Sequence, residues 1–160
     1  MAEVFTESAL LFVAVVFAFC LVIGSFLNVV VHRLPIMMER EWRAQCEEIT
    51  KTPPEYDIPE GRFDLVAPRS RCPSCGTEIK AWQNIPVISY LLLGGKCAHC
   101  KASISARYPL VELMTAILAA VAAWRFGVGW EAVMAIVMTL TLVPIAMIDA
   151  ETQLIPDSIV

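Results

Sequence analysis

The sequence predicts an all-α polytopic membrane protein with a small cytoplasmic tetracysteine module of the zinc-knuckle type. Three observations lead to this fold class: 58% of the 160 residues are hydrophobic, uncharged stretches occur towards both ends, and two C-x-x-C pairs lie between them. Ordinary soluble domains are nearer half apolar. Eleven of the twelve Lys and Arg residues fall between Arg33 and Arg107, which indicates one polar insert between membrane segments.

The first apolar stretch covers residues 8–31 and contains no charged side chain. At about 1.5 Å per residue it can cross a hydrocarbon core of roughly 30 Å with some tilt. Acidic residues precede it and it is long for a signal-peptide core, so we expect a retained transmembrane helix. His32 and Arg33 mark the interface, and Pro35 is expected to end the helix. A short separate helix is predicted over 38–49.

Small and polar residues occur near the end of this first stretch. Gly24 and Ser25 are small enough to let another helix approach closely within a membrane. Asn28 lies in the apolar run, so its amide needs a partner other than lipid. That partner is either a neighbouring helix or part of a functional site, and the sequence leaves both open.

Two further apolar segments predict a membrane hairpin, with helices over 109–124 and 132–148. Pro109 suits the first turn of the second helix. Trp124 and Trp130 flank the intervening turn and fit an aromatic belt at one interface. Glu112 lies one turn into the second helix, where the helix N-terminus or a nearby Arg can stabilise an acid. It is therefore either an interfacial capping residue or a functional one.

The two C-x-x-C pairs, Cys72/Cys75 and Cys97/Cys100, are about twenty residues apart. Each two-residue gap lets both sulfurs point into one concavity, and four thiolates fill the tetrahedral shell of Zn²⁺. The spacing resembles the paired C-x₂-C pattern of zinc sites. We expect a structural zinc ion on these four residues, within a unit that we call the cysteine module (about 68–105).

Other interpretations of these thiols are two disulfides, four unconnected thiols or a redox pair. His99 lies in the second pair and is left out because four cysteines already fill the shell; Cys20 and Cys46 are expected to be free thiols. The insert between the pairs is apolar and either packs on the knuckles or lies at the membrane surface. It contains Trp82, Ile85, Pro86, Val87, Ile88, Tyr90 and Leu91–Leu93.

The distribution of Lys and Arg predicts the orientation in the membrane. The basic-rich loop from Arg33 to Arg107 should be cytoplasmic, which places the cysteine module in a reducing compartment where zinc is favoured over disulfides. Asp149 then ends the last helix on the same side. A carboxylate is disfavoured at a helix C-terminus, so Asp149 is a candidate functional acid. Asp157 follows a proline and is either a capping or a functional residue, and Glu151 is expected in a polar turn.

Four stretches together resemble the bacterial type IV prepilin leader peptidases, which also N-methylate their product. They are GSFLNVVVHRLP (24–35), CPSC with CAHC, SARYPLVELMTA (105–116) and MIDAETQLIPD (147–157). The resemblance implies a multi-pass aspartic endopeptidase of the bacterial inner membrane, with the cysteine module and Asp149 on the cytoplasmic side. It implies cleavage of prepilins and type II secretion pseudopilins after Gly, then N-methylation with S-adenosylmethionine. The lipid bilayer is the other expected partner, and nucleic acid is not expected.

In that family the catalytic pair consists of two aspartates, and the first corresponds to Asp149. The second, in a G-x-G-D motif, has no counterpart here and is expected beyond Val160, so the chain resembles an N-terminal part that is inactive alone. Asp157, Glu112, Asn28 and Arg33 are further functional candidates. The expected units are 1–35, the first helix and its cytoplasmic end; 36–107, the loop with the cysteine module; and 108–160, the hairpin and start of the peptidase domain.

Two other functions are compatible with the residues. A non-catalytic membrane adaptor would explain the metal module and the helices, but not the segment around Asp149. A fragment that carries mainly the methyltransferase activity is the second alternative. The sequence has no glycine-rich strand–turn–helix fingerprint that would place the methyl donor.

Overall fold

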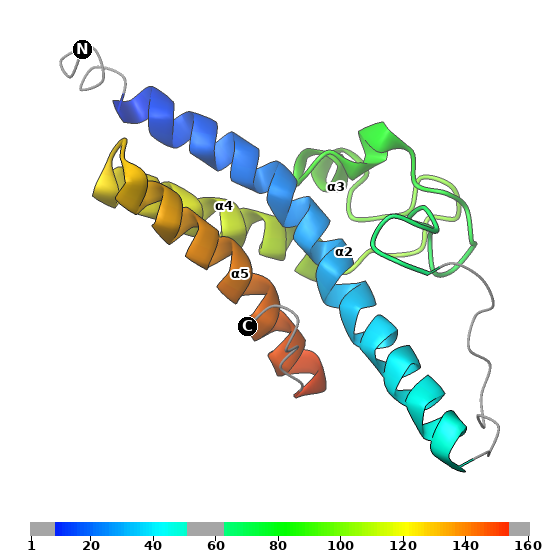
Figure 1. Ribbon diagram of the computed structural model, residues 1–160. Coiled ribbons are helices and arrows are strands. Elements are labelled where there is room, and N and C mark those ends of the chain that lie inside the picture. Colours follow the sequence, from blue (N-terminus) through cyan, green and yellow to red (C-terminus); the bar gives the residue numbers. More distant parts are fainter. Residues whose placement is uncertain (1–8, 51–62, 154–160) are drawn as a thin grey trace.

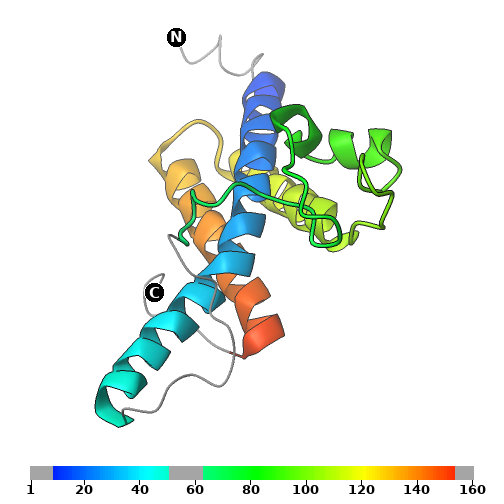
Figure 2. The ribbon, with the colours of Figure 1, turned by 90° about the vertical axis from the view of Figure 1, so that its right-hand side faces the viewer.

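The computed structural model describes residues 9–50 and 63–153. Within these ranges the chain is helical, with two isolated β-bridges in the cysteine module and no strand. The long helices are α2 (Ala9–Thr50), α4 (Arg107–Phe126) and α5 (Trp130–Thr152). All three are long and apolar enough to cross a membrane. The short η1 (Ala81–Asn84) and α3 (Ile88–Leu92) belong to the cysteine module, which lies on one side of α2 (Figures 1 and 2).

Helix α2 is a single helix of 42 residues, and the prediction that Pro35 ends it is wrong. Pro35 removes one backbone donor, but the next fifteen residues are rich in Met, Glu, Arg, Ala and Gln, which favour helix strongly. The expected separate helix over 38–49 is therefore the outer part of α2. Figures 1 and 2 show this cyan end extending beyond the rest of the helices.

Helices α4 and α5 form the predicted hairpin, but both are longer than expected. Pro109 lies in the first turn of α4, as its fixed φ favours. Helix α5 continues four residues beyond the expected end at 148, until Gln153 adopts a left-handed conformation with φ +53°. Asp149 is therefore in the last turn. Glu151 is also helical, which corrects its expected place in a polar turn.

The contact between α2 and α4 is antiparallel and close. Asn28 of α2 lies beside Tyr108, and Gly24, one turn earlier, lies against Glu112. A Cβ atom on Gly24 would be only 2.9 Å from the Cα atom of Glu112, so the two backbones touch at this point. Small residues on α4 continue the contact, and Ala116, Ala119 and Ala123 are buried. This agrees with the prediction that Gly24 and Ser25 allow close packing.

Candidate metal centre and polar contacts at the membrane boundary

The first C-x-x-C pair forms a tight knuckle that is closed by backbone hydrogen bonds. The Cys72 N–H donates to the Thr77 carbonyl at 3.0 Å, and the Gly76 N–H donates back to the Cys72 carbonyl at 2.8 Å. Gly76 has φ +68°, a conformation that glycine adopts without a Cβ clash. The turn therefore favours glycine directly after Cys75.

The second pair repeats this geometry. The Cys97 N–H donates to the Ala102 carbonyl at 2.8 Å, and the Lys101 N–H donates to the Cys97 carbonyl at 3.1 Å. Lys101 takes the position equivalent to Gly76 and has φ +61° despite its side chain. The two knuckles are therefore structurally equivalent, and only the first has glycine at the left-handed position.

The two knuckles bring four sulfur atoms together. The Sγ atoms of Cys72, Cys75, Cys97 and Cys100 all lie within 4.8 Å of one another. Cys72 and Cys100 are 3.8 Å apart, far beyond a disulfide bond of about 2.05 Å. A tetrahedral ion with Zn–S bonds of about 2.3 Å needs sulfur atoms roughly 3.8 Å apart. The donor set therefore fits one tetrahedral metal ion, and His99 is not part of it.

The ionisation of these thiols also favours a cation. Backbone hydrogen bonds from Cys100 and then His99 lower the pKa of Cys97 to about 6. The pKa of Cys100 is raised to about 11: a backbone hydrogen bond involving Ala102 lowers it, but lost solvation and the neighbouring cysteine sulfurs outweigh that bond. Neighbouring thiolates repel one another, so the four sulfurs ionise together only around a positive ion.

Arg33 connects α2 to the chain that leads into the cysteine module. Its guanidinium is buried and donates to the carbonyls of Asp64 and Pro68, at 2.6 Å each. It also lies 5.5 Å from the ring centroid of Phe63, and the Arg40 guanidinium lies 4.5 Å from the same centroid. Arg33 thus does more than mark the interface, because it fixes the loop against the helix.

Glu112 connects the cysteine module to the membrane helices. Its carboxylate is buried, accepts a 2.8 Å hydrogen bond from the Val87 N–H and also bonds to the Ser25 side chain. Asn28 donates to the Tyr108 carbonyl at 3.1 Å. Asn28 therefore makes the helix–helix contact that was one of its two predicted roles. Glu112 holds the backbone just before α3, a partner that its place near the start of α4 did not predict.

Asp149 and Glu151 lie in the last turn of α5. The Asp149 side chain is exposed, and its carbonyl accepts the 2.8 Å capping bond from the Gln153 N–H. Glu151 forms an ion pair with Arg107, which ties the end of α5 to the start of α4. Asp157 lies outside the described residues. Asn28 and Glu112 meet at one helix contact, while Arg33 makes its contacts in the adjoining loop.

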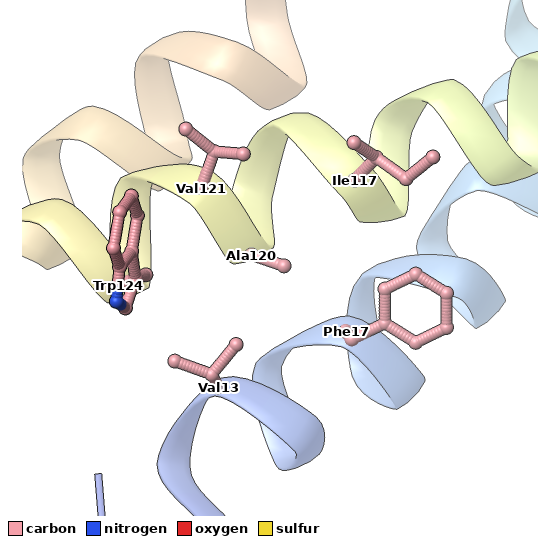
Figure 3. Close-up of a pocket in the computed structure, with 6 residues that line it drawn as sticks. All are labelled: Val13, Phe17, Ile117, Ala120, Val121 and Trp124. Carbon is pink, nitrogen blue, oxygen red and sulfur yellow. The ribbon is translucent and has the colours of Figure 1, made fainter. Parts of the chain in front are cut away.

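A shallow hollow of about 230 Å³ opens between the N-terminal part of α2 and the C-terminal part of α4 (Figure 3). Apolar and aromatic side chains line it, including Phe17, Ile117 and Trp124. Such a surface suits acyl chains or another helix. It does not offer the polar and charged groups that a sulfonium nucleoside such as S-adenosylmethionine would need.

Three membrane-crossing helices and a tetracysteine centre define a polytopic membrane protein with a small metal-binding module. The family model "Bacterial Peptidase A24 N-terminal domain" matches residues 18–126. The chain therefore belongs to the bacterial peptidase A24 N-terminal domain family. No solved structure matches it.

Several relatives bear the name prepilin leader peptidase/N-methyltransferase. The one from Stutzerimonas stutzeri is 50% identical over 99% of this chain and 54% of its own length. That from Pseudomonas aeruginosa is 53% identical over 88% of this chain and 48% of its own, and that from Neisseria gonorrhoeae is 49% identical over 86% and 48%. The chain thus spans about half the length of the relatives it matches.

Proposed function

We propose that this chain forms the N-terminal part of a prepilin leader peptidase/N-methyltransferase of the bacterial inner membrane. The observation that carries the proposal is the 50% identity to the Stutzerimonas stutzeri relative over 99% of the chain. In this proposal the enzyme cleaves prepilins and type II secretion pseudopilins after Gly and then methylates the new N-terminal residue.

Asp149 is assigned as one member of the catalytic carboxylate pair. In such a pair an ionised carboxylate activates water while a protonated partner polarises the amide, and their proximity separates their pKa values. An exposed acid in the last turn of a membrane helix lies where a substrate passes from the bilayer to its polar leader. The partner aspartate is assigned to a part of the longer protein outside this chain.

The cysteine module is assigned a structural zinc ion, held by Cys72, Cys75, Cys97 and Cys100. Zinc with four thiolate ligands has no open position for substrate, so its contribution is to folding. The bias of Lys and Arg supports a cytoplasmic position for this module and for Asp149. S-adenosylmethionine is the expected methyl donor, and Asp157 remains a possible functional residue.

The test of Asp149 uses the full-length protein that contains this chain. Asp149→Asn keeps the shape of the side chain but cannot ionise, so we expect prepilin cleavage to be abolished. Membrane insertion and zinc content should stay at the wild-type level. Cleavage is measured by the mobility shift of a purified prepilin in detergent micelles or vesicles.

The matched control is Glu131→Gln, the same acid-to-amide change in the first turn of α5, at the opposite end of that helix. It should leave cleavage unchanged. Normal processing by Asp149→Asn would refute the assignment of Asp149. Loss of processing in both variants would indicate that an acid-to-amide change anywhere in α5 impairs the enzyme. The assignment of Asp149 would then lose its support.

A further inference from the structure

The cysteine module has an exposed apolar face that the metal centre does not explain. The chain from 81 to 95 has no charged residue and is flanked by Lys80 and Lys96. Its exposed members form what we call the α3 face: Trp82, Ile85, Ile88, Leu91 and Leu92. Leu91 and Leu92 are 70% and 77% exposed, which is unusual for two consecutive leucines next to a folded metal module.

The α3 face is one side of a short amphipathic element. At about 100° per residue, Ile88, Leu91 and Leu92 of α3 fall within an arc of roughly 100°. Tyr90 points away from this arc, and its hydroxyl donates to the Ile104 carbonyl in the second knuckle at 3.3 Å. One side of α3 is therefore fixed beside the second knuckle, while Ile88, Leu91 and Leu92 on the other side are exposed.

The position of α3 along the membrane helices indicates what covers this face. The Val87 N–H, just before α3, bonds to Glu112, which is five residues into α4 and about 7.5 Å along its axis from Arg107. Glu112 in turn lies against Gly24, within the uncharged run of α2. The start of α3 is thus held beside parts of α2 and α4 that are themselves expected to contact lipid.

The backbone at this point supports a fixed position. Val87 has φ +56°, a conformation rarely adopted by β-branched residues, and the hydrogen bond to Glu112 forms at this same residue. A side chain from a membrane helix therefore holds the peptide that sets the direction of α3. The α3 face is therefore held at the level of Glu112, with its apolar side chains exposed.

We propose that the α3 face inserts into the bilayer interface and contacts lipid acyl chains, with Lys80 and Lys96 reaching the headgroups on either side. Apolar side chains at this depth gain free energy by leaving water, and lysine side chains can extend to the polar layer. The cysteine module is then attached to the membrane at its own surface as well as through its two chain connections. This inference depends on the membrane helices and not on the reaction that the longer protein catalyses.

The test places a single tryptophan at Leu92 in the 160-residue chain, reconstituted in phosphatidylcholine vesicles, with the four native tryptophans changed to Phe. Lipids brominated near the headgroup end of the acyl chain are the quencher. We expect a blue-shifted emission that these lipids quench at least about twofold, as for an interfacial side chain. The control is Val66→Trp in the same background, because Val66 is 79% exposed but lies in the loop held by Arg33. Its emission should be red-shifted and unquenched.

A second probe avoids a new side chain on α3: native Trp82 is kept as the only tryptophan and should also be quenched. Zinc content confirms that each variant is folded. Red-shifted, unquenched emission from both probes would show that water covers the α3 face. Blue-shifted but unquenched emission would show that protein covers it. Either result overturns the proposal.

Discussion

The close contact between Gly24 and Glu112 makes a strong prediction for Gly24→Val. A Cβ atom there would lie 2.9 Å from the Glu112 Cα and 3.1 Å from its carbonyl oxygen. Carbon atoms normally pack at about 3.5–4.0 Å, so the helices must separate by roughly 0.6–1.1 Å. The Asn28–Tyr108 bond, now 3.1 Å, would stretch beyond hydrogen-bond range. Overpacking costs about 1–3 kcal/mol and the lost bond about 0.5–1.5 kcal/mol, so we expect a loss of roughly 1.5–4.5 kcal/mol.

This loss is measured as the thermal unfolding midpoint in detergent micelles, followed by circular dichroism. At about 2–4 °C per kcal/mol for a chain of this size, the midpoint should fall by roughly 3–18 °C. The control is Ala18→Val, which also introduces a valine side chain, but at an exposed position of the same helix. It should leave the midpoint unchanged. A midpoint for Gly24→Val equal to that of the control would refute the close approach of the two helices.

Two further predictions concern the cysteine module. Cys72→Ser should abolish the proposed zinc binding and expose the module to limited proteolysis, because metal binding free energy is folding free energy in small sites of this kind. A zinc content equal to wild type, measured with a chromophoric chelator, would contradict it. Lys101→Gly should stabilise the module by about 1 kcal/mol, and Gly76→Lys should destabilise it by a similar amount, because both positions have positive φ. The measurement is the chelator concentration at the midpoint of zinc release. If this midpoint moved in the same direction for both variants, the two knuckles would not be equivalent.

The helices were predictable because lipid leaves the backbone few alternatives. A run of uncharged apolar residues must satisfy its own hydrogen bonds, so its length and place in the sequence give a helix directly. The ends were less predictable. Pro35 was expected to stop α2, but a proline costs one backbone bond, and the helix-forming residues that follow outweigh this loss. At α5, the polar residues after Ile148 continue the helix for one more turn.

The cluster of four cysteines was predictable because each C-x-x-C pair brings two sulfurs together, and a tetrahedral shell needs two such pairs. The polar contacts at the membrane boundary were not. Arg33 binds two backbone carbonyls and Glu112 binds a backbone N–H, and every residue other than proline offers both groups. The sequence therefore does not indicate which residue supplies the backbone group that Arg33 or Glu112 binds. The Arg107–Glu151 pair joins residues 44 positions apart, and only the fold of the hairpin makes them neighbours.

The ring of Phe63 contacts two arginines that are seven residues apart on α2, one on each side of Pro35. The proline is the place where this helix is weakest against bending, because one backbone bond is missing there. Phe63 therefore braces α2 at Pro35, because its ring contacts Arg33 before the proline and Arg40 after it. The outer part of α2 is thus connected through Phe63 to the loop that leads into the cysteine module, and displacement of this loop would remove the ring from both arginines.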